Sequence, residues 1–295
     1  MQGTLVRCAV YWPCMLWLLV AVMCFPATSY AQLTPTDLLK RVKETYAGAN
    51  QYQFVTRLVE RRKGAETTGS DEIAVDKHGR VWFKAVGSAA LAWSGGREAG
   101  VLISVADGRN VWVYLEQQKL YKRVEGALDP RDTDSEDDSI DNPKSFLRKV
   151  MDGRFLRYSR FASMSNRSKI VREESCTANG VRSECYVLEI NAKTTSPQTV
   201  TGVYTLWIDK QRYLVLRDDF SLIDKVAGTY TNSIRYDIAR INIEIPERLF
   251  SFTPPKGAKE VSSFFPISHL STNQAAGLGR GLRSEAPRIS MRCAL

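Results

Sequence analysis

The sequence predicts an α+β fold in which a long antiparallel sheet packs against two helices. Over much of residues 50–245, apolar and polar residues alternate with the period of two that is typical of strands. Two segments, 34–48 and 142–157, instead carry apolar residues at helical spacing. The order along the chain is therefore helix, strands, helix, strands, and each helix needs an apolar surface to cover.

Residues 1–31 have the pattern of a secretory signal peptide. Arg7 gives a positive start, an apolar run spans Met15–Phe25, and small residues precede Gln32, where we expect cleavage. An uncleaved membrane anchor is the alternative, although Pro13 interrupts the apolar stretch. The mature chain is expected in the periplasm.

We expect residues 32–262 to form one domain and residues 263–295, which are rich in Ser, Gly and Arg, to form a disordered tail. The chain has 41 basic and 32 acidic residues and a formal net charge of +9. In an exported protein this charge favours peripheral contact with anionic membranes, and we expect no nucleic acid as a partner.

The first helix is predicted to begin at Thr34, a suitable N-cap, with Pro35 in the first helical position, and to end at Gly48. Its apolar face consists of Leu38, Leu39, Val42 and Tyr46. Strands follow from Asn50 to Val124, although Ala89–Gly100 gives no clear pattern. The turns between these strands are predicted at Arg61–Gly64, Asp76–Gly79, Asp107–Arg109 and Glu116–Lys119.

The segment Asp129–Asp141 is strongly acidic and is expected to be a disordered surface loop. A calcium loop starting at Asp132 is the alternative, but it lacks the central Gly and has Pro143 where a Glu is needed. Asn142 and Pro143 then begin the second helix. Its predicted apolar stripe is Phe146, Leu147, Val150, Met151 and Phe155, opposite the basic residues Lys144, Arg148, Lys149 and Arg157.

Later strands are expected in Lys169–Asn191, in Val200–Phe220 with a turn at Asp209–Gln211, and in Thr229–Ile245, and Pro254 and Pro255 end the last strand. Of the six cysteines, three lie in the signal segment and Cys293 lies in the tail.

An oxidising compartment favours a disulfide between Cys176 and Cys185. A two-residue turn at Asn179 and Gly180 would place the two cysteines on a diagonal about 7–8 Å apart, so the disulfide is expected to need a four-residue loop, 179–182. Two free thiols beside a tight turn are the alternative.

Residues suited to catalysis are sparse, so we expect no enzyme, no cofactor and no metal. The two histidines are His78, in a turn, and His269, near the tail. Ser94 follows Trp93 and precedes two glycines, but Ala92 stands where a nucleophile elbow needs its first Gly. Metal-binding and phosphate-binding motifs are absent from the sequence.

Two stretches resemble the outer-membrane lipoprotein carrier and lipoprotein-sorting family (LolA/LolB-like). They are Ser104–Tyr121 (SVADGRNVWVYLEQQKLY) and Phe250–Gly257 (FSFTPPKG). The resemblance implies a strongly curved antiparallel sheet, an unclosed half-barrel, with helices covering its open side. It also implies that the protein moves acylated lipoproteins or lipids between inner-membrane and outer-membrane sorting components.

An apolar cavity would be lined by one face of the strands, with each buried methylene of an acyl chain contributing about 0.8 kcal/mol. A closed core is the alternative role for the same residues. The family has an Arg-Pro pair at a bend where this chain has Asp76–Gly79, and Lys77 is a weaker substitute for that Arg. A lipoprotein-sensing regulator on the same fold is the alternative function. The predicted lining residues are Phe54, Leu58, Val81, Phe83, Val111, Val113, Tyr204, Leu206, Phe250 and Phe252.

Overall fold

The computed structural model describes residues 33–94, 100–129, 139–193, 201–224 and 228–265. The chain divides into an N-terminal unit, residues 1–33, and a second unit, Thr34–Leu295, which contains every described helix and strand. The predicted signal peptide, Cys293, His269, most of the acidic loop and nearly all of the predicted tail lie outside the described residues. The division into one domain and a tail stays a prediction.

Twelve strands form a single sheet in the order β12-β6-β5-β4-β3-β2-β1-β11-β10-β9-β8-β7. Every neighbouring pair is antiparallel except β12 and β6, which are parallel. The strands are β1 (Tyr52–Arg62), β2 (Ala65–Val75), β3 (Val81–Gly87), β4 (Val101–Ala106), β5 (Asn110–Leu115), β6 (Leu120–Glu125), β7 (Ser168–Ala178), β8 (Val181–Lys193), β9 (Thr201–Asp209), β10 (Val215–Asp224), β11 (Gly228–Ile241) and β12 (Lys259–Glu260).

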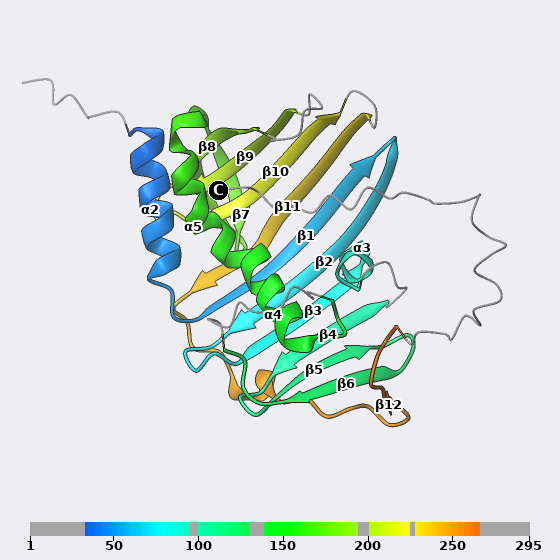
Figure 1. Cartoon of the computed structure of the whole chain (residues 1–295). Helices are drawn as coiled ribbons and strands as arrows, with labels where there is room; N and C mark the ends of the chain where they lie inside the picture. The colour runs from blue at the N-terminus through cyan, green and yellow to red at the C-terminus, as the bar shows by residue number, and fades with distance from the viewer. Residues whose placement is uncertain (1–32, 95–99, 130–138, 194–200, 225–227, 266–295) are drawn as a thin grey trace, which may run out of the picture. The chain divides into compact units, whose positions relative to one another are not determined.

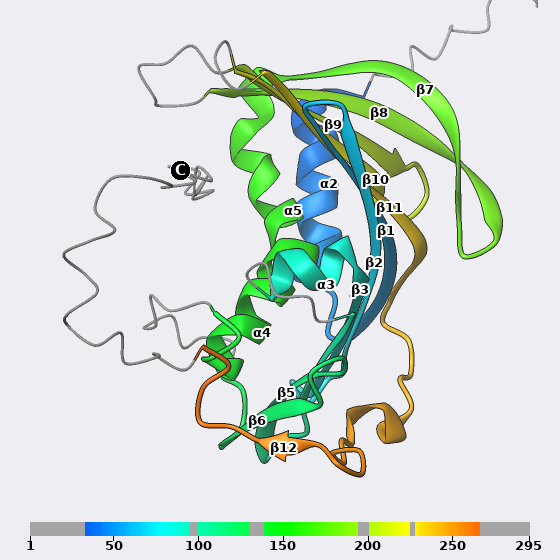
Figure 2. The ribbon, with the colours of Figure 1, turned by 90° about the vertical axis from the view of Figure 1, so that its right-hand side faces the viewer.

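The sheet bends strongly, and the α-helices lie on its concave side (Figures 1 and 2). The strands at its two edges, β7 and β12, do not pair with each other, so the sheet does not close. The predicted α+β class and unclosed half-barrel are confirmed. The helical elements are α2 (Pro35–Ala47), α3 (Ser88–Trp93), α4 (Pro143–Met151), the π-helix η1 (Asp152–Leu156), α5 (Arg157–Arg160), and the 3₁₀ helices η2 (Phe161–Arg167) and η3 (Glu247–Phe250).

Helix α2 has the predicted bounds because its ends are satisfied locally. The Thr34 hydroxyl accepts a hydrogen bond from the Asp37 backbone N–H at 3.1 Å, and Gly48 ends the helix. The face buried against the sheet is the one that the sequence predicts, and it comprises Leu38, Leu39, Val42 and Tyr46.

The second helical segment runs without interruption from α4 through η1 and α5 to η2, and we call it, together with α2, the cover. Asn142 caps it by accepting a hydrogen bond from the Ser145 N–H at 3.3 Å. The π-turn in η1 adds residues to one turn and so rotates the following side chains about the axis. The prediction that Arg157 lies on the outer polar side is therefore wrong, because Arg157 points inward and pairs with a buried aspartate.

The prediction that a strand ends at Pro254 and Pro255 is wrong, because the segment Phe250–Gly257 is not a strand. It consists of the end of η3 and an irregular stretch that leads to β12. Pro246, Pro254 and Pro255 lack the backbone N–H that a ladder requires, which explains why no strand forms here. Helix α3, within the stretch that gave no clear pattern, packs on β2 where Gly69 lets the chains approach closely.

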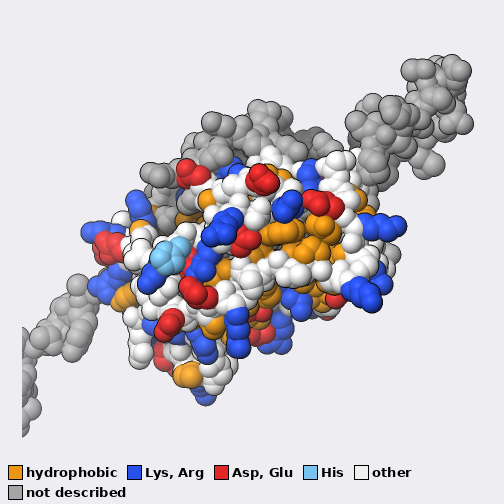
Figure 3. Space-filling model, turned by 90° about the horizontal axis from the view of Figure 1, so that it is seen from below, with side chains coloured by type: hydrophobic (Ala, Val, Ile, Leu, Met, Phe, Trp, Pro, Cys, Tyr) orange, Lys and Arg blue, Asp and Glu red, His pale blue; other side chains and the backbone are white. Residues whose placement is uncertain are grey.

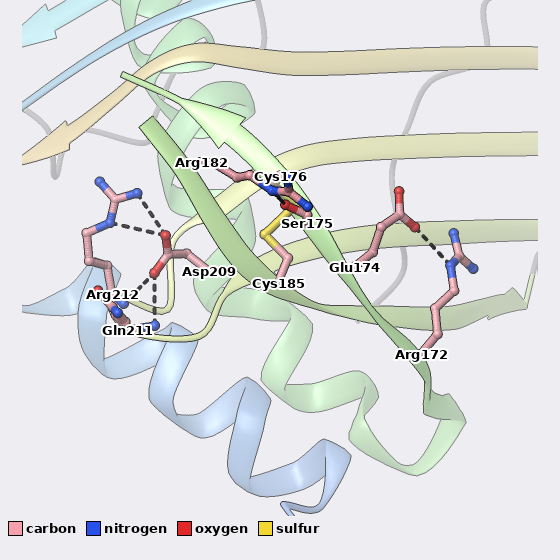
Figure 4. Close-up of a disulfide and its surroundings, with 9 residues drawn as sticks. All are labelled: Arg172, Glu174, Ser175, Cys176, Arg182, Cys185, Asp209, Gln211 and Arg212. Atoms are coloured by element: carbon pink, nitrogen blue, oxygen red, sulfur yellow. Dashed lines mark hydrogen bonds and ion pairs between the residues drawn. A yellow bond between two sulfur atoms is a disulfide. The ribbon is translucent and has the colours of Figure 1, made fainter. Parts of the chain in front are cut away.

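The β7–β8 hairpin contains the predicted disulfide between Cys176 and Cys185 (Figure 4). The expectation of a four-residue loop is wrong, because Ala178 pairs with Val181 across a two-residue turn and Cys176 lies opposite Ser183. Near its tip the hairpin is a two-stranded ribbon, and such ribbons twist strongly. The diagonal Cα atoms are 6.1 Å apart, which a disulfide can span.

The described chain continues in an ordered contact beyond residue 262. The backbone N–H of Phe264 and the hydroxyl of Ser263 each donate to the Asp141 carboxylate at 2.6 Å, and the Phe264 side chain is buried. Within the described residues, no helix has the length and apolar character needed to span a bilayer.

Candidate functional site

Successive residues along each strand point alternately to the concave and the convex face of the sheet, so cross-strand neighbours form rows on the concave face. One row joins Phe54, Ile73, Phe83, Ser104 and Val113 across five strands. Cross-strand neighbours share a face, so these residues all lie under the helices. By the same register, eight of the ten predicted lining residues lie on the concave face: Phe54, Leu58, Val81, Phe83, Val111, Val113, Tyr204 and Leu206.

The other two predicted lining residues lie on the convex face, so that part of the prediction is wrong. Phe250 packs against Ala74 and Trp82, which alternate with the concave residues of β2 and β3. Phe252 contacts Trp112 and Tyr114 with ring centroids 5.6 and 5.8 Å apart. The proline-rich segment that holds both phenylalanines runs along the outside of the sheet, so an apolar side chain there does not face the cover.

An aromatic cluster joins the cover to the sheet. Phe155 of η1 stacks on Tyr52 with ring centroids 4.0 Å apart, and Tyr46 of α2 lies 4.9 Å from Phe155. Tyr236 of β11 meets Phe54 edge-on at 5.4 Å. Burial raises the pKa of Tyr236 and of Tyr46, so both phenols stay neutral.

A buried ion pair lies beside this cluster. The Arg154 Nε of η1 is 3.0 and 2.9 Å from the two carboxylate oxygens of Asp71 on β2. The Asp71 side chain is fully buried and that of Arg154 is 7% exposed. Thr56 donates to the same carboxylate at 2.5 Å. Burial opposes the charge on Arg154, but Asp71 more than offsets it, so the pKa of Arg154 is raised.

A second ion pair lies one helical turn further along the cover. Arg157 contacts Asp218 of β10, whose side chain is 2% exposed, and Tyr158 donates to Asp218 at 3.2 Å. The Tyr158 and Tyr236 hydroxyls are 2.7 Å apart. Asp219, the next residue along β10, instead bonds to Ser233 and Arg217 on the outer face. The two neighbouring carboxylates therefore face opposite sides of the sheet, as adjacent residues on a strand do.

These two ion pairs hold the cover on the sheet, and the sequence did not predict them. Arg154 and Arg157 are three residues apart, a spacing that places two side chains on one face of a helix. With the π-turn known, this spacing would have indicated that both arginines face the sheet. Lys77, the expected substitute for the family's Arg, lies exposed at the β2–β3 bend. In this chain the arginines are on the cover and the carboxylates are on the sheet.

The covered face is filled in this structure. Side chains with no accessible surface border neither solvent nor a void of water size, and Val81, Phe83, Val111, Val113 and Leu206 all have 0% exposure. Two hollows of about 490 Å³ occur elsewhere in the described part, one beside the end of α2 and one beside α3. Binding under the cover therefore requires the cover to move.

Among the described residues, no group of three or more His, Cys, Asp and Glu side chains is placed to hold a metal ion. His78 is exposed in a turn. Ser94 is buried, and its hydroxyl donates to the Leu91 carbonyl at 3.2 Å, an arrangement that caps α3.

The fold and the covered face together define an unclosed half-barrel whose apolar interior lies under helices that two ion pairs join to the sheet. No family model matches the chain, and no curated protein matches its sequence. Solved structures similar to it include a LolA superfamily protein and an outer membrane lipoprotein-sorting protein domain from Vibrio parahaemolyticus.

One similar structure is the Pseudomonas aeruginosa MucA/MucB complex, at 14% identity and a TM-score of 0.37, with 74% of this chain and 61% of that chain covered. This chain thus spans about three fifths of that one. The LolA superfamily protein NE2245 from Nitrosomonas europaea shows 11% identity and a TM-score of 0.29, with 75% of this chain and 98% of that chain covered. LprF from Mycobacterium bovis shows 10% identity and a TM-score of 0.36, with 72% of this chain and 95% of that chain covered.

Proposed function

We propose that this protein is a periplasmic carrier that binds acyl chains of lipoproteins or lipids on the concave face and moves them toward the outer membrane. The observation that carries this proposal is a broad apolar sheet face covered by helices that two ion pairs fasten. The carrier would receive its cargo from an inner-membrane component and deliver it to an outer-membrane component. It performs no reaction and needs no cofactor.

The energetics of the concave face support carriage. An acyl chain of about 15 methylenes contributes roughly 12 kcal/mol when it is fully buried. This gain can offset the loss of contacts that follows when the cover lifts from residues such as Phe83 and Phe54. Arg154 and Arg157 become hydrated in the open state, which lowers the cost of separating them from Asp71 and Asp218.

The test is native mass spectrometry, with lipid extraction, of the mature protein purified from its own envelope fraction. We expect acyl lipid or acylated protein bound one to one, and its loss in Val113→Asp, which places a charge on the covered face. Val181→Asp is the matched control, because Val181 is 60% exposed at the hairpin tip. A folded wild type that carries no lipid and takes up no fluorescent acyl probe would overturn the proposal.

A regulator that binds a membrane-protein partner is the second candidate, and the filled interior favours it. A protein that works by contact with a partner has no need to open, and the concave residues are packed as in an ordinary core. Pull-down from solubilised envelope distinguishes the two. A stable protein partner retained by the lipid-free wild type and by Val113→Asp alike supports the regulator.

A further inference from the structure

Part of the concave face extends beyond the cover. The free ends of β10, β11 and β1 run past the helices (Figure 1). One row of cross-strand neighbours crosses this region, and we call it the rim row. Its members, from β8 to β1, are Ile190, Tyr204, Phe220, Asn232 and Glu60.

The rim row is apolar at one end and accepts hydrogen bonds at the other. Ile190 is fully buried, whereas the other four members are only half-buried. The rings of Tyr204 and Phe220 lie 4.5 Å apart, and next to them Asn232 and Glu60 present oxygen atoms. With strands about 4.8 Å apart, the row is roughly 19 Å long, which suits an extended acyl chain.

The apolar end leads under the cover. Phe161 of η2 lies 5.2 Å from Tyr204, and Tyr158, a member of the buried network, lies 5.9 Å from Phe161. Aromatic rings thus continue from the half-buried row into the core. A chain lying along the row would end where the cover must first lift.

The polar end offers hydrogen-bond acceptors. The Asn232 side-chain oxygen is buried and has no hydrogen-bond partner within the described residues, while its Nδ2 donates to the Tyr230 hydroxyl at 3.4 Å. Glu60 forms no ion pair within the described ranges. A buried acceptor without a donor costs free energy, which a ligand N–H can recover.

We propose that the rim row is a first binding site for one acyl chain whose polar end carries a hydrogen-bond donor such as an amide N–H, and that it is accessible while the cover is closed. This inference rests on the proposed carriage of acyl chains. The chain lies over Phe220 and Tyr204, and its N–H donates to Glu60 and, once the Asn232 side chain turns its buried oxygen outward, to Asn232. An ester-linked chain makes the same apolar contacts but offers no donor.

The experiment measures binding of two probes, a hexadecanoyl amide and a hexadecanoyl ester of the same environment-sensitive fluorophore, to the purified mature protein. We expect the amide to bind about 3- to 10-fold more tightly than the ester. Phe220→Ser should weaken both probes about 10-fold, and Asn232→Leu should abolish the preference for the amide. Ile223→Ser is the matched control, because Ile223 lies on the same strand, on the opposite face, and is 56% exposed.

The outcomes separate this inference from the carrier proposal. If the wild type binds neither probe, both are wrong. If both probes bind and Phe220→Ser binds like Ile223→Ser, carriage stands and the rim row is not the site. If Phe220→Ser weakens binding but amide and ester bind equally, the donor requirement is wrong. Circular dichroism of each variant verifies that it is folded.

Discussion

Removing the Arg154 guanidinium should destabilise the protein strongly while leaving the apolar stem in place. In Arg154→Met the Asp71 carboxylate, which is fully buried, keeps only the Thr56 hydroxyl and the Trp93 N–H, at 2.5 and 3.4 Å. A buried charge left without its partner costs about 3–5 kcal/mol. Urea unfolding followed by far-ultraviolet circular dichroism measures the change in the free energy of unfolding.

The matched control is Arg57→Met, because the Arg57–Asp237 pair has side chains 66% and 39% exposed. We expect that control to cost less than about 1 kcal/mol. Replacing both buried partners, in Asp71→Leu/Arg154→Met, should restore the stability to within about 1 kcal/mol of the wild type or exceed it. If Arg154→Met costs no more than Arg57→Met, then Asp71 is hydrated in solution and the reasoning about the buried pair fails.

Three further predictions concern the supporting structure. Replacing Cys176 and Cys185 by Ser should lower the free energy of unfolding by about 2.5 kcal/mol, since the disulfide closes a loop of about ten residues. An equal loss in the reduced wild type would verify that the missing disulfide is the cause. Burial would raise the pKa of Asp209, but the Arg212 side chain and two backbone N–H groups more than offset this effect, so the pKa lies below 3.8. The stability that ionised Asp209 contributes is therefore present above pH 3.8 and is lost as the pH falls through the pKa of the folded state. Asp209→Asn should therefore cost about 1–2 kcal/mol at pH 7 and less at pH 3, and an equal cost at both would contradict this. Gly69→Ala should cost about 2 kcal/mol and loosen α3 in hydrogen exchange, because a Cβ there would lie 2.4 Å from the Ala89 backbone nitrogen, and unchanged exchange would refute the contact.

Local patterns predicted the elements whose causes are local. Thr34, Pro35 and Gly48 determine α2 through capping, so its bounds follow from the sequence. The turns at Asp76–Gly79 and Asp107–Arg109 likewise separate strands as expected, because aspartates there accept hydrogen bonds from their own turn backbone.

Elements that depend on distant contacts were not predicted. The inward direction of Arg157 follows from a π-turn that has no sequence signature, and the carboxylate that receives Arg157 lies on a strand far along the chain. The alternation of apolar and polar residues placed Phe250 on the concave face, but its real position, on the convex face, depends on the path of the proline-rich segment. The cysteine register was misjudged because a flat ladder was assumed, whereas the ribbon twists.

If the cover lifts as the proposed carriage requires, the ion pairs affect how readily it does so. An all-apolar contact would resist opening by the full loss of buried area, but Arg154 and Asp71 regain hydration when they separate, so their pair adds little net resistance. The variant Asp71→Leu/Arg154→Met, although its stability should lie within about 1 kcal/mol of that of the wild type or exceed it, should therefore take up an acyl probe more slowly, as stopped-flow fluorescence would measure. A variant that takes up the probe at the wild-type rate would show that uptake does not require separation of this pair, and loading through the rim alone would then suffice.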